Sequence, residues 1–145
     1  MGNKKNNHSS NAIFYIIGQE NVSTNIDLYF SDIKNVIHHI KEHIPDSIIY
    51  YAPHPFYKKR NHDFFAAPIY DQLIDSNLIS EIFIMENNIK NIVSIFSSVS
   101  LHLSQNKDIN IYYFNTSKYY DNNALEIMKS IGAIDIYNLK ALSKH

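Results

Sequence analysis

Short runs of β-branched and aromatic residues alternate along the chain with longer segments in which apolar residues recur at helical spacing. The first run, residues 13–17, stops at Gly18 and predicts a buried strand. Over residues 26–44, isoleucine and phenylalanine recur every three or four positions, with Asp32 among the polar residues between them. This pattern predicts a long amphipathic helix that ends at Pro45.

The same alternation continues to the end of the chain. Further strands are predicted over residues 48–51, 81–84, 92–96, 109–114 and 134–137, and further helices over 68–74, 98–103 and 122–131. Gly132 is expected to end the last of these helices. Because successive parallel strands need crossover connections, the alternation predicts an α/β fold: a Rossmann-like open, mostly parallel sheet with helices on both faces.

The composition limits the classes of function. The chain has 145 residues, of which 45% are hydrophobic and 19% charged, enough for one folded domain, expected over residues 12–145 after a disordered leader at 1–11. A net charge of -1 argues against nucleic acid as a partner. Without cysteine there are no disulfides or thiolate sites, and no apolar run is long enough for a transmembrane segment. The expected location is the cytoplasm, either free or peripheral at the inner membrane.

Three short segments follow predicted strands at the edge where an open α/β sheet binds ligands. They are Gly18-Gln19, His54-Pro55, and Ser97-Ser98 at the start of a predicted helix. Serine hydroxyls and unpaired N–H groups at a helix start suit a phosphate, and a histidine held between two prolines can donate to an oxygen that gains negative charge. The segments together predict an anion site.

Each segment also has a structural interpretation. Ser97 and Ser98 could cap a helix, His54 could sit in a rigid loop, and Gly18 could serve a turn. The basic cluster at residues 58–60, which would raise the local potential for an anion, could equally be a solvated turn.

His39 and His43 lie four residues apart on the long predicted helix, which is a spacing that metal ligands use. The sequence has no cysteine, and the two histidines do not form the His-Glu-x-x-His pattern of zincins. We therefore expect no metal site and no cofactor.

Taken in order, the segments at residues 16–19, 50–55 and 95–99 resemble the carboxy-terminal half of bacterial sialyltransferases. The similarity is to the lipooligosaccharide sialyltransferases of glycosyltransferase family 52 and to the related polysialyltransferases. In those families a His-Pro motif and a serine/threonine pair contact CMP; here they correspond to His54-Pro55 and Ser97-Ser98. The resemblance runs from about residue 13 to residue 136.

This resemblance implies one half of a GT-B glycosyltransferase that binds CMP-sialic acid, or CMP, for lipooligosaccharide or capsule synthesis. His54 would be the catalytic residue that stabilises the leaving phosphate, together with Ser97 and Ser98. Pro55, Gly18 and Gln19 would line the donor site, and Glu81 or Glu86 would bind the ribose. The family's acidic-acidic-Gly base motif is not found in this sequence, so a glycan acceptor would need a missing or separate domain, and the chain is expected to be inactive alone.

Two other functions remain open. The chain could be a non-catalytic α/β module that associates with itself or with another protein through its edge strands, as a homo- or hetero-oligomer. It could also be a GT-B domain that uses another nucleotide sugar.

Overall fold

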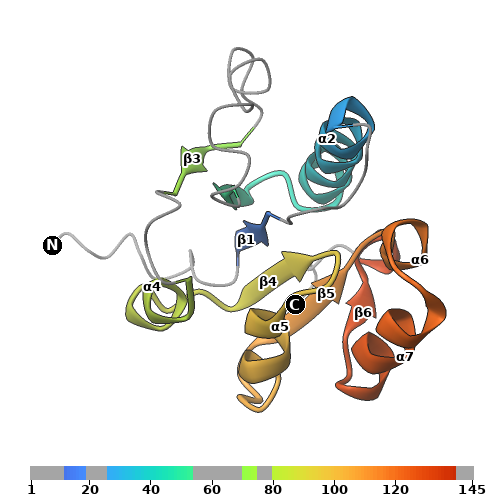
Figure 1. Cartoon of the computed structure of the whole chain (residues 1–145). Helices are drawn as coiled ribbons and strands as arrows, with labels where there is room; N and C mark the ends of the chain where they lie inside the picture. The colour runs from blue at the N-terminus through green and yellow to red at the C-terminus, as the bar shows by residue number, and fades with distance from the viewer. Residues whose placement is uncertain (1–11, 19–25, 54–69, 75–79, 140–145) are drawn as a thin grey trace, which may run out of the picture.

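The protein is built around one parallel sheet. The computed structural model describes residues 12–18, 26–53, 70–74 and 80–139. Within them a six-stranded sheet has the order β3-β2-β1-β4-β5-β6, and every pair of neighbours is parallel (Figure 1). The strands are β1 (Ile13–Ile17), β2 (Ile48–Ala52), β3 (Gln72–Leu73), β4 (Asn91–Ser94), β5 (Asn110–Tyr113) and β6 (Ile134–Asp135). The predicted α/β, Rossmann-like class is confirmed.

Helices cover both faces of this sheet, because each parallel strand is joined to the next by a crossover. They are α2 (Ile26–His43), α4 (Ser80–Glu86), α5 (Ser98–Leu103), α6 (Thr116–Tyr119) and α7 (Asn122–Ser130), followed by the 3₁₀ turn η3 (Ile136–Asn138). Figure 1 shows α2 on one side of the sheet and α4 and α5 on the other. Within the described residues, no helix combines the length and apolar character needed to cross a bilayer.

The core has two halves, one on each side of β1. Phe14 and Ile16 belong to the half that packs against α2, whereas Ile13, Tyr15 and Ile17 belong to the half that packs against α4, α5 and α7. The side chains of Phe14, Tyr15 and Ile16 are fully buried. A strand buried on both faces reads as a continuous apolar run, which explains why the sequence predicted it so clearly.

Two of the predicted elements are wrong, and a third is too long. Residues 81–84, predicted to be a strand, lie in helix α4. The parallel strands β3 and β4 need a crossover connection, and the alternating apolar pattern of these residues does not reveal it. Leu73, predicted to be helical with Ile74, lies in β3, while Pro68 and Ile69 are outside the described residues. The predicted last strand is shorter, since Ile136 begins η3 after Asp135 caps it.

Candidate functional site

The strand order defines one position where a ligand crevice is expected. From β1 the chain builds the sheet in one direction through β2 and β3, and then in the other through β4, β5 and β6. Between β1 and β4 the successive connections therefore diverge to opposite faces. In open α/β sheets, ligands bind outside the carboxyl ends of the strands at this switch point.

Gly18 and Ser97 lie at the carboxyl ends of these two strands. Gly18 is buried directly after β1, and its N–H donates to the Ala52 carbonyl at 2.7 Å, so pairing with β2 continues through it. Ile16 pairs with Val93 of β4, and continuing that register sets Gly18 beside Ile95. Ser97 follows within two residues, so the structure brings Gly18 and the Ser97-Ser98 pair to the same edge.

Ser97 is the N-cap of α5. Its hydroxyl oxygen accepts a hydrogen bond from the Val99 N–H at 3.1 Å, and its backbone is extended. The capping interpretation from the sequence is therefore confirmed. The hydroxyl hydrogen takes no part in that bond, and Ser98 beside it is exposed. Two hydroxyl donors are thus compatible with an anion at this position.

The other loop of the predicted site starts at the neighbouring strand. Pro53 is buried directly after β2, and β2 pairs with β1. His54, Pro55 and Gln19 lie outside the described residues, as does the basic cluster at 58–60. Their predicted roles stay predictions.

The two candidate glutamates are placed differently. Glu81 accepts a hydrogen bond from His102 Nδ1 at 2.9 Å, and His102 lies one helical turn after Ser98 on α5. Glu86 ends α4 just before the turn that enters the amino end of β4. Of the two, Glu86 therefore lies toward the edge of the sheet opposite Ser97.

A buried carboxylate lies near the same carboxyl edge. Asp32 of α2 is 5% exposed, which is unexpected because the sequence placed it among the helix's polar residues. It accepts hydrogen bonds from Lys118 Nζ at 2.8 Å and from the Tyr119 hydroxyl, both on α6. Thr116 at the start of α6 donates to the Ile95 carbonyl at 2.6 Å. These bonds join α2, α6 and the loop after β4.

The hydrogen bonds control the ionisation of this group. Burial alone would disfavour the charged form of Asp32, but hydrogen bonds from Lys118, Tyr119 and Asn115 outweigh it and hold the pKa of the carboxyl below its usual range. Burial, and then the bond to Asp32, raises the pKa of the Tyr119 phenol well above its ordinary value. Tyr119 is therefore a hydrogen-bond donor here and no general base.

The sequence does not reveal this group, because its members are far apart in the chain. Asp32 and Lys118 are separated by 86 positions. The one local signal is that Asp32 directly precedes Ile33, whose side chain is also fully buried, on the inward side of α2.

A second polar group lies near the other end of α2. His39, Glu42 and His43 place one potential ligand atom each within 4.8 Å of one another. These residues could hold a metal ion.

Comparison of the sequence with models of known protein families and with curated proteins found no match.

Replacing Asp32 with asparagine should lower the free energy of unfolding by about 1.5–3 kcal/mol at pH 7, since it removes charge-assisted bonds to Lys118 and Tyr119. The lowered pKa means that this stabilisation is complete above the usual carboxyl pKa of about 4 and is lost as the pH falls through the lower folded-state pKa. Urea unfolding of both proteins between pH 2 and pH 7 measures the difference. The exposed Asp46→Asn is the control, and an equal effect of both variants would contradict the account.

Replacing Ser97 with alanine should cost about 1 kcal/mol of stability without any ligand, because the cap on the Val99 N–H is lost. The Ser98→Ala variant should stay within about 0.5 kcal/mol of the wild type, since Ser98 is exposed. Thermal and urea unfolding distinguish the two. If Ser98 proved the more costly, the cap would be wrongly assigned.

Proposed function

We propose that this chain binds the nucleotide of a CMP-linked sugar, such as CMP-sialic acid, at the carboxyl edge of the sheet between β1 and β4. One observation carries the proposal. The three segments chosen from the sequence follow β2, β1 and β4, and these strands are adjacent in the sheet. Segments far apart in the chain therefore start at one edge, where a single small ligand could contact them all.

The polar groups at this edge of the sheet suit the binding of a phosphate. Ser97 and Ser98 supply hydroxyl donors, and the first N–H groups of α5 face the same side. Because α5 has only six residues, its dipole is weak, so most of the binding energy must come from hydrogen bonds and from a cation. His54, which directly follows Pro53, is the proposed donor to the phosphate oxygens. On a donor sugar it would stabilise the charge that develops when the glycosidic bond to CMP breaks.

The resemblance to family 52 sialyltransferases selects CMP among the nucleotides. The fold itself would serve other nucleotides as well, because function lies in the site and not in the fold. The proposal therefore concerns binding of the donor. Transfer to a glycan acceptor would need a general base, for which the sequence offers no acidic-acidic-Gly motif.

Calorimetric titration with CMP tests the proposal. We expect the wild type to bind, and His54→Ala and Ser98→Ala to weaken binding by about 1.5–3 kcal/mol each, which corresponds to about tenfold or more in Kd. Ser130→Ala is the matched control, because Ser130 is an exposed serine at the far end of α7, and its affinity should equal that of the wild type.

Equal affinity of all four proteins for CMP would contradict the proposal. The same titrations with UDP and GDP show whether another nucleotide is preferred. If no nucleotide changes the thermal stability and the protein forms oligomers that depend on concentration, the interaction-module function is favoured instead.

A further inference from the structure

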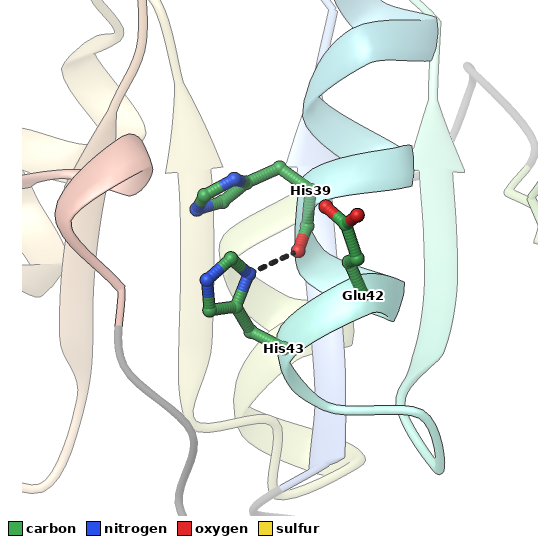
Figure 2. Close-up of side chains that lie close together, drawn as sticks. All are labelled: His39, Glu42 and His43. Carbon is green, nitrogen blue, oxygen red and sulfur yellow. Dashed lines mark hydrogen bonds between the residues drawn. The ribbon is translucent and has the colours of Figure 1, made fainter.

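The last two turns of α2 gather three side chains of the kinds that bind transition metals. His39 and His43 lie four residues apart, so they share one side of the helix, and Glu42 lies between them in sequence. Figure 2 shows the two imidazole rings stacked on one side of α2 and the Glu42 carboxylate across the His39 main chain from them. The ring centroids of the histidines are 4.2 Å apart. One potential ligand atom from each residue lies within 4.8 Å of the other two.

His39 has a buried nitrogen without a partner. Its Nε2 atom is inaccessible to solvent and makes no hydrogen bond among the described residues. The Tyr137 ring of η3 packs edge-on against the imidazole at 5.0 Å between centroids, which holds the ring in place. Buried polar atoms in folded proteins are nearly always satisfied, so an unpaired imidazole nitrogen indicates a missing partner.

His43 is already oriented as metal-binding histidines are. Its Nδ1–H donates to the His39 backbone carbonyl at 2.9 Å, as the dashed line in Figure 2 shows. A carbonyl can only accept, so the lone pair of this imidazole is on Nε2. Fixing one ring nitrogen by a backbone carbonyl is the usual support for a histidine ligand.

The surrounding charges favour a cation. Glu42 and Asp135 both act on His39 with negative charge. The nearest lysine on the helix, Lys41, is held by Asp71 at 2.8 Å. An added ion would therefore meet one carboxylate and two imidazole rings.

We propose that His39, Glu42 and His43 form a binding site for a divalent transition metal of the zinc class. Two imidazoles and one carboxylate are a recurring set of three protein ligands for such ions, with a water or another group in the fourth position. Tetrahedral bonds of about 2.0–2.1 Å put neighbouring ligand atoms about 3.3 Å apart. The three side chains must therefore close by up to about 1.5 Å, and the exposed Glu42 must turn toward the imidazole rings.

The metal site uses none of the residues of the proposed nucleotide site. His43 ends α2, which leads into the amino end of β2, whereas His39 packs against Tyr137, which follows the carboxyl end of β6. The metal proposal therefore does not rest on the proposed function. All three ligands would come from the last two turns of α2, so a metal there would stabilise the end of this helix.

Titration of the untagged full chain with ZnCl2, after removal of metals with a chelator, tests the proposal. Calorimetry should show one tight site per chain, and zinc should raise the midpoint of thermal unfolding. Glu42→Gln and His43→Gln should each weaken zinc binding by about tenfold or more. His38→Gln is the matched control, because His38 is an exposed histidine on the same helix outside the cluster, and its affinity should be unchanged.

Circular dichroism of each variant without metal shows that loss of binding is not loss of folding. X-ray absorption at the zinc edge should then report imidazole ligands in the wild type and fewer in His43→Gln. No zinc binding by the wild type overturns the proposal. So does an equal loss in His38→Gln and His43→Gln, which would mean that zinc binds to surface histidines without a defined site.

Discussion

Parallel pairing of β1 with β2 on one side and with β4 on the other is the interaction on which the rest of the structure depends. It requires that every connection cross over a face of the sheet, so helices cover both faces and β1 becomes fully buried. It also brings the carboxyl ends of all strands to one edge. Gly18 and Ser97 lie together at that edge for this reason.

The parts of the fold that the sequence predicts are those whose burial follows a simple period. The apolar run of β1 and the helical spacing of α2 gave bounds within about a residue of the observed ones. The α4 segment was misassigned because Ile82 and Ile84 alternate with other residues as in a strand, although only Ile84 is buried. Only the need for a crossover between β3 and β4 reveals a helix there, and β3 is too short to be recognised beforehand.

Some residues of the candidate sites could likewise be predicted from the sequence, and others could not. Ser97 could be placed from the sequence because a serine at a strand-to-helix junction has a local meaning, and the structure gives it the capping role. The Asp32 network and the stacked histidines could not be predicted from the sequence. The partners of Asp32 are on α6, and the packing of His39 depends on Tyr137 of η3. Burial of a polar group is a tertiary property that a helical pattern does not contain.

The proposed nucleotide site lies at the carboxyl edge of the sheet between β1 and β4. Its most direct test is a nuclear magnetic resonance titration of the labelled protein with CMP, in which each backbone amide reports its own environment. We expect saturable shifts of the amides of Gly18, Ser97 and Ser98, with the amides around Glu86 and His43 unchanged. Shifts confined to the opposite edge, or none at all, would contradict it.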